Sequence, residues 1–215
     1  MPAKIITNER GGDSAIPPVS WRQSLNCDRG YGWALLAALA LLLLCAVGGA
    51  PWLLALRYER ASILRGEWWR LLSAHFVHLG LTHLLLDGSA LLLLWALYAR
   101  SLSARSWLLI AVGTMAAIDA GLWWLAPQVQ WYAGISGLLH GLWAVGAVQG
   151  AHRREVSGWL LLVALAAKLA REHYTGASLV VSSFPVVPAA HLYGALGALA
   201  TLAVLAGLTL WRRPS

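Results

Sequence analysis

The sequence predicts an all-α membrane protein that crosses the bilayer several times. Of the 215 residues, 59% are hydrophobic and only 12% are charged, which is too little charge to cover a soluble domain of this length. Uncharged runs such as residues 33–47 and 91–98 are typical of polytopic membrane proteins. Helices are the expected form, because backbone groups in lipid must find hydrogen-bond partners within their own segment.

The chain divides into a polar leader and six apolar segments. Residues 1–30 are rich in Gly, Pro and Ser, which predicts a flexible cytosolic tail, and residues 31–215 are expected to form one membrane domain. The leader is too long and too mixed in charge for a signal peptide, so the first apolar run is interpreted as a retained span. The six predicted spans are residues 32–56, 75–98, 106–126, 134–150, 157–170 and 187–211. Tryptophans near several segment ends fit interfacial belts.

The distribution of basic residues predicts the orientation. With both termini cytoplasmic, ten basic residues lie inside and six lie outside, in agreement with the positive-inside rule. The inner ones are Lys4, Arg10, Arg22, Arg29, Arg100, Arg105, Arg153, Arg154, Arg212 and Arg213, and the outer ones are Arg57, Arg60, Arg65, Arg70, Lys168 and Arg171. The net charge of +7 is therefore spread between apolar runs, and we expect no nucleic-acid partner.

This topology brings polar residues of three segments to one depth. The second, fourth and sixth segments all begin on the outer side, and Asp87, Ser136 and His191 lie in their first halves. Ionisable groups in a span cost about 2.5–3.5 kcal/mol at a helix centre, so they commonly mark functional sites. The ionisable residues in the predicted spans are His75, His78, His83, Asp87, Asp119, His140 and His191.

Ser136 is the candidate nucleophile, within Gly134-Ile135-Ser136-Gly137 at the start of the fourth segment. A serine hydroxyl needs a neighbouring base to attack a bond at neutral pH. His191 is the preferred base, because it lies at matching depth in an otherwise uncharged segment. His140 is the alternative, four residues after Ser136 on the same helix face. Small residues around both sites, including Gly137, permit the helices to approach closely.

An acyl-transfer site also needs hydrogen-bond donors for the developing oxyanion. His83 and the backbone N–H of Ser136, at a helix N-terminus, are the candidate donors. Asp87 lies one turn beyond His83 and could donate only if protonated. Asp119 is as well suited to pairing with a neighbouring helix as to chemistry. Cys27 and Cys45 predict neither a disulfide nor a metal site.

At these residues the chain resembles the rhomboid family of intramembrane serine proteases. The resemblance rests on the order of four short blocks along the chain. They are Trp69-Arg70, the spacing of His78, His83 and Asp87, Gly134-Ile135-Ser136-Gly137, and Ala190-His191-Leu192-Tyr193-Gly194. The run from Ser136 to Gly141, which contains His140, is most similar to the bacterial rhombosortase branch.

The resemblance implies a six-helix bundle in the bacterial inner membrane, with its active site towards the outer face. Ser136 would be the nucleophile and His191 the general base, with no third acid, while His83 would help to form the oxyanion hole. Membrane-anchored proteins would be the substrates, and the rhombosortase branch is associated with Gly-Gly-bearing C-terminal anchors. The chain departs from the family at Asp87, where an asparagine is usual, and at His140, where a tyrosine often packs against the catalytic histidine.

Three other functions remain open at this level. A catalytically inactive rhomboid-like protein would bind membrane helices without cutting them, and Asp87 keeps that reading open. A haem or metal protein could use the histidines, although no HExxH motif is present. A small transporter would suit the polar cluster, but the two halves show no repeat. We expect no cofactor and no metal, and the sequence does not give the oligomeric state.

Overall fold

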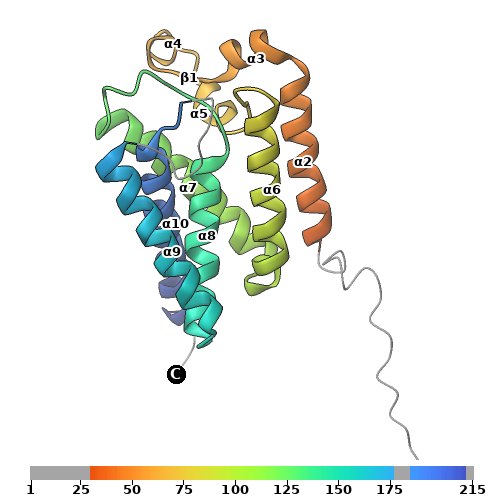
Figure 1. The fold of residues 1–215 in the computed structure, drawn as a ribbon, viewed down its shortest axis with the longest axis vertical. Coiled ribbons are helices and arrows are strands. Elements are labelled where there is room, and N and C mark those ends of the chain that lie inside the picture. The colour runs from red at the N-terminus through yellow and green to blue at the C-terminus, as the bar shows by residue number, and fades with distance from the viewer. Residues whose placement is uncertain (1–29, 177–184, 212–215) are drawn as a thin grey trace, which may run out of the picture.

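The described residues contain six long helices, which lie side by side in one bundle (Figure 1). The computed structural model describes residues 30–176 and 185–211, so Cys27 and nearly all of the predicted N-terminal tail fall outside the described residues. The helices are α2 (Tyr31–Val47), α6 (Leu81–Tyr98), α7 (Ala104–Trp124), α8 (Ser136–His152), α9 (Val156–Thr175) and α10 (Pro188–Trp211). The start of α2 and the end of α10 lie at the same end of the bundle (Figure 1).

Helix α8 is the centre of the bundle, with α10, α9, α7 and α6 packed around it. Small residues allow its backbone to touch that of α10. A Cβ on Gly194 would lie 2.1 Å from the carbonyl oxygen of Gly137, and a Cβ on Gly141 would lie 2.8 Å from that of Gly194. The close approach predicted from these residues is therefore confirmed.

The first apolar segment is not one continuous helix, as predicted for residues 32–56. Helix α2 ends at Val47, and α3 (Gly49–Leu56) leaves it at an angle of 109°. Gly49 has a φ of +55°, which costs glycine little, and Pro51 lies in the first turn of α3, where its missing N–H is tolerated. These residues end the first helix and turn the chain.

Two other segment boundaries also differ from the prediction. Helix α6 begins at Leu81 rather than near residue 75, so His75 and His78 precede it, although both are buried. Helix α9 continues beyond residue 170 to Thr175 and therefore includes Glu172. Hydropathy ends the segment too early here, because charged residues of the last turns pair with one another or with a neighbouring helix.

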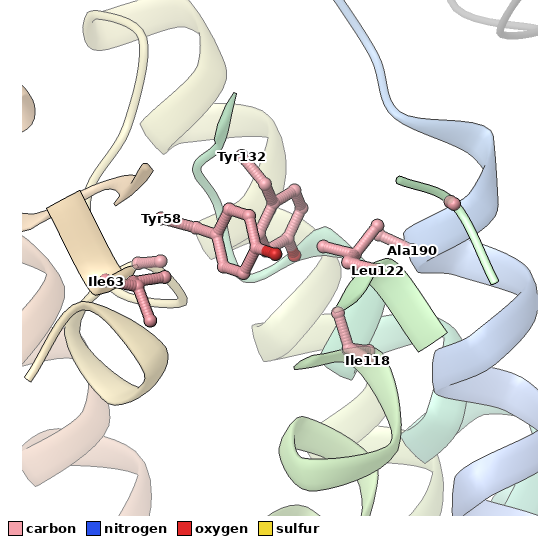
Figure 2. Close-up of a cluster of buried hydrophobic side chains, with 8 residues drawn as sticks. Tyr58, Ile63, Ile118, Leu122, Tyr132 and Ala190 are labelled. Carbon is pink, nitrogen blue, oxygen red and sulfur yellow. The ribbon is translucent and has the colours of Figure 1, made fainter. Parts of the chain in front are cut away.

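Short elements cover the end of the bundle where α3 lies (Figure 1). They include α4 (Arg60–Leu64), α5 (Arg70–Ser73) and an antiparallel pair of two-residue strands, β1 (Tyr58–Glu59) and β2 (Trp131–Tyr132). This pair is a departure from the all-helical prediction. Tyr58 and Tyr132 lie opposite each other in it, and their rings pack with Ile118, Leu122 and Ala190 of α7 and α10 (Figure 2). The end cap is thereby fixed to the bundle.

Arg70 holds the segments of this cap together. Its buried guanidinium donates to the carbonyl oxygens of Leu54 at 2.8 Å and Arg57 at 2.9 Å, and to Glu67 Oε2 at 2.7 Å. A planar group with several fixed donors suits this role, because one side chain can satisfy several carbonyls at a chain crossing. The neighbouring Trp69 is exposed.

The number of membrane spans is only partly established by length and composition. Among the described helices, α6, α7 and α10 are long and apolar enough to cross a membrane, and the bent pair of α2 and α3 would make a fourth. Helix α8 has 17 residues, and α9 carries three charged residues. The protein is therefore mostly helical and multi-pass, and the six-span arrangement stays a prediction.

Candidate active site

Ser136 and His191 meet where α8 begins, in the part of the bundle near the end cap. His191 lies one turn into α10, and its Nε2 is 3.0 Å from Ser136 Oγ. The close packing of α8 on α10 at Gly194 makes this distance possible. His191 is 4% exposed, so its imidazole is shielded from bulk solvent. The geometry is that of a serine hydroxyl beside its general base.

His140 does not contact the Ser136 hydroxyl, although it lies on the same helix. Its Nδ1 is 2.7 Å from the backbone oxygen of Ser136, and because a carbonyl only accepts, Nδ1 carries the proton. The His140 ring instead stacks on His191, with centroids 4.0 Å apart and planes 12° apart. A ring contact with His191 is therefore present at the position where a tyrosine is usual in the resembling family.

Glu172 was not anticipated as part of the site. Its Oε2 lies 2.7 Å from His191 Nδ1, and its Oε1 pairs with Lys168 one turn earlier on α9. Its side chain is fully buried. The i, i+4 spacing of Lys168 and Glu172 after an apolar run was the available signal, because it allows a charged pair to extend a helix into the bundle.

His83 and Asp87 form a second polar group beside the serine. The N–H of Leu79 donates to His83 Nδ1 at 3.3 Å, which leaves Nε2 as the protonated nitrogen. This Nε2 lies 3.2 Å from Asp87 Oδ2, and the Nε2 of His78 lies at the same distance. Asp87 Oδ2 thus lies close to two imidazole nitrogens. The alternative, a protonated Asp87 that donates to an oxyanion, has no support in this arrangement.

Gly134 shapes the turn that leads into Ser136. Its φ is +121°, and a Cβ would lie 2.7 Å from Cε1 of the His83 ring. Its N–H donates to the oxygen of Ala74, and its oxygen accepts from the Tyr132 hydroxyl at 2.6 Å. Burial raises the pKa of Tyr132, so this hydroxyl stays protonated and keeps donating. Both backbone groups of Gly134 are therefore fixed, and Tyr132 is a supporting residue that the sequence alone did not single out.

A cavity of about 200 Å³ opens over the Ser136 hydroxyl. It is mostly apolar, with the rings of Trp131 and Tyr132 from β2 on one side. The first N–H groups of α8 lie at the helix N-terminus, where they have no partner within the helix and attract negative charge. The lining of the cavity thus includes the Ser136 hydroxyl at the N-terminus of α8 and the His191 imidazole.

The remaining predicted ionisable residues lie apart from the serine. His75 Nε2 is 3.5 Å from Asp119 Oδ1, so Asp119 pairs with the segment before α6. In the part of the chain that the structure describes, His140, Glu172 and His191 are the group close enough to hold a metal ion. Their geometry does not suit one, because the lone pairs of two stacked imidazole rings lie in nearly parallel planes and do not converge on one ion. The same stacking leaves no room for a haem between the two histidines.

The fold and site define a polytopic helical membrane protein with a serine–histidine pair at the start of its central helix. The Rhomboid domain family matches residues 65–208, which is more than half of the chain. The chain belongs to the rhomboid family. It is 30% identical over 97 residues to "Putative rhomboid protease YdcA" of Bacillus subtilis (strain 168), which covers 45% of the chain. The match spans about half the length (49%) of that curated relative.

Proposed function

We propose that this protein is an intramembrane serine protease that uses Ser136 as nucleophile and His191 as general base. The observation that carries the proposal is the 3.0 Å approach of His191 Nε2 to Ser136 Oγ at a helix N-terminus, beneath a cavity. The substrates are membrane-anchored proteins cut in or near their transmembrane segments. Membership of the rhomboid family supports this class of substrate.

The proposed reaction proceeds through an acyl-enzyme. Ser136 Oγ attacks the scissile carbonyl carbon while its proton passes to His191 Nε2. The tetrahedral intermediate collapses as the C–N bond breaks, and His191 returns the proton to the departing amine. Water then attacks the acyl-Ser136 ester with the help of His191, which releases the new carboxyl end and restores the hydroxyl.

The negative oxygen of the intermediate is stabilised by N–H groups at the start of α8. Preorganised donors of this kind each contribute about 10²–10³-fold to acyl transfer. His83 Nε2–H is the further candidate donor, and it must turn from Asp87 towards the substrate to act. Gly134 and Gly137 support the hole by allowing the backbone to lie close to its neighbours.

A substrate helix has to unwind before its peptide bond reaches the cavity, because helical carbonyls are hidden by the side chains around them. Small residues at the cleavage position favour this, and the aromatic wall of Trp131 and Tyr132 leaves limited room. We therefore propose Gly-Gly-bearing C-terminal anchors of exported proteins as substrates, as in the rhombosortase branch. The protein would act in a bacterial inner membrane with its site towards the outer face.

Labelling with a fluorophosphonate probe tests the catalytic proposal. Purified protein in detergent should react covalently, and Ser136→Ala should abolish the label without changing the thermal unfolding temperature. Absence of label on folded wild-type protein would contradict the proposal. Comparing membrane-protein C-termini in cells with the wild type and with Ser136→Ala would then identify the substrates, and cleavage outside Gly-Gly anchors would refute only the narrower substrate class.

An inactive helix-binding protein is the second candidate, because Asp87 stands where the family usually has an asparagine and its Oδ2 lies 3.2 Å from His83 Nε2, the candidate oxyanion donor. That reading predicts co-purification of intact membrane helices without any Ser136-dependent label. If Asp87 is what makes the protein inactive, Asp87→Asn, which restores the residue usual in the family, should gain a Ser136-dependent label that the wild type lacks. In an active protease the wild type and Asp87→Asn should both be labelled.

A further inference from the structure

We propose that Glu172 is a positioning residue for His191, so that the site is a Ser136–His191–Glu172 triad rather than a dyad. This inference rests on the proposed function. It starts from one contact, the 2.7 Å distance between Glu172 Oε2 and His191 Nδ1. The contact lies on the side of the imidazole opposite to Ser136, which is the position of the acid in serine-hydrolase triads.

The contact determines which nitrogen of His191 carries the proton. A carboxylate only accepts, so His191 Nδ1 donates to Glu172. Nε2 of the neutral ring then has a free lone pair, 3.0 Å from Ser136 Oγ. That is the tautomer a general base requires. Without Glu172, the opposite tautomer would present an N–H to the serine and could not take its proton.

The carboxylate is held in place by its second oxygen. Lys168 pairs with Oε1, and the side chain of Glu172 is fully buried while that of Lys168 is 13% exposed. Burying an unpaired carboxylate is very costly, and pairing it with an ammonium offsets that cost. Lys168 therefore explains how an ionised acid can stay inside a largely apolar bundle.

The helix packing also indicates that the Glu172–His191 contact serves the site rather than helix association. Helix α9 packs mainly against α8 and only lightly against α10. The Glu172–His191 contact crosses this sparsely packed junction at the level of the serine, rather than adding to an extensive interface. His140 stacks on a face of the His191 ring, and its Nδ1–H donates to the backbone oxygen of Ser136. Glu172 is therefore the group that meets the positive charge developing on His191 along the ring edge opposite Ser136.

The test compares fluorophosphonate labelling rates of the wild type, Glu172→Gln and Glu172→Asp. The amide has the size of the acid but can donate to Nδ1 and stabilise the wrong tautomer, so labelling should slow by about 10²–10⁴-fold. Glu172→Asp keeps a carboxylate on a shorter stem and should recover part of the rate. With a cleavable peptide, kcat should fall much more than KM changes. Glu155→Gln is the matched control, because Glu155 is exposed at the other end of α9 and should leave the rate unchanged.

A second measurement is made on the wild type and does not depend on how the Glu172 variants fold. Nuclear magnetic resonance of the wild type with ¹⁵N-labelled histidine reports the tautomer of each ring, and His191→Gln assigns the signal. We expect His191 to be protonated at Nδ1, and protonation at Nε2 would overturn the triad. A wild-type labelling rate in folded Glu172→Gln would overturn it as well. Failure of the triad leaves wild-type labelling intact, whereas failure of the proposed function removes it.

Discussion

Gly134 illustrates how a single residue constrains the site. Its φ of +121° is accessible essentially only to glycine, and an added Cβ would lie 2.7 Å from the His83 ring. We predict that Gly134→Ala lowers the stability by at least about 1–3 kcal/mol from backbone strain and displaces Ser136. The thermal unfolding temperature and the rate of fluorophosphonate labelling should therefore both fall.

The control for this substitution is Gly88→Ala in α6. An added Cβ at Gly88 meets no atom within 4 Å, and alanine favours a helix over glycine by about 1 kcal/mol. Labelling should be unchanged and stability equal or higher. If Gly134→Ala and Gly88→Ala lose labelling rate and stability equally, the role assigned to the turn before Ser136 is contradicted.

The sequence predicted that Ser136 and His191 lie close together, but it did not predict that Glu172 contacts His191. Both lie early in apolar segments that start on the same side, so topology alone brings them to one depth. Glu172 lies after the point where hydropathy falls, and its burial depends on Lys168 and on contact with another helix. Such pairing is a tertiary property that hydropathy along the chain does not report.

At the scale of elements, the contact between α8 and α10 sets the distance between nucleophile and base. A Cβ on Gly194 would lie 2.1 Å from the backbone oxygen of Gly137. Gly194→Ala must therefore push α10 away, at a cost of about 1–3 kcal/mol for overpacking. We predict slower labelling, because the Ser136–His191 distance lengthens, together with a lower unfolding temperature.

Gly207→Ala provides the comparison on the same helix. Gly207 has no atom within 4 Å of an added Cβ, so the substitution should leave labelling and unfolding unchanged. If Gly194→Ala is labelled at the wild-type rate, the site tolerates separation of α8 and α10, and the proposed role of their close contact is wrong.

The ends of the elements were less predictable than their existence. Hydropathy gave the bodies of all six long helices, whereas the break at Gly48 depends on how glycine and proline turn a chain. The short strands β1 and β2 were missed, because two residues are too few to form a periodic pattern. Their pairing brings Tyr58 beside Tyr132 and so depends on contacts across the whole chain.

At the scale of the whole molecule, the open question is whether α8 and α9 cross the membrane. Helix α8 is surrounded by other helices, so it needs less apolar length and surface than a helix that faces lipid. Helix α9 buries Glu172 and pairs it with Lys168, which reduces the cost of its charges. We therefore predict that a count based on hydropathy alone misses spans in this bundle, whose central helix is shielded and whose α9 charges are paired.

Thiol labelling of single-cysteine variants tests the six-span prediction directly. In a background with Cys27 and Cys45 replaced by serine and alanine, cysteines are placed at exposed positions near the two ends of α9, Ser157 and Tyr174. A membrane-impermeant maleimide added to intact spheroplasts should label Tyr174→Cys at once, but Ser157→Cys only after permeabilisation.

Helix α7, which is long and apolar enough to span, calibrates the assay. Gln128→Cys, beyond the end of α7, and Ala104→Cys, at its first residue, should behave as the outer and inner positions respectively. If both α9 positions react from the same side while the α7 pair differs, α9 does not span and the two termini lie on opposite sides. If the positions divide as predicted, the count of basic residues gives the correct orientation, and Ser136 lies in the outer half of the membrane with access to external water.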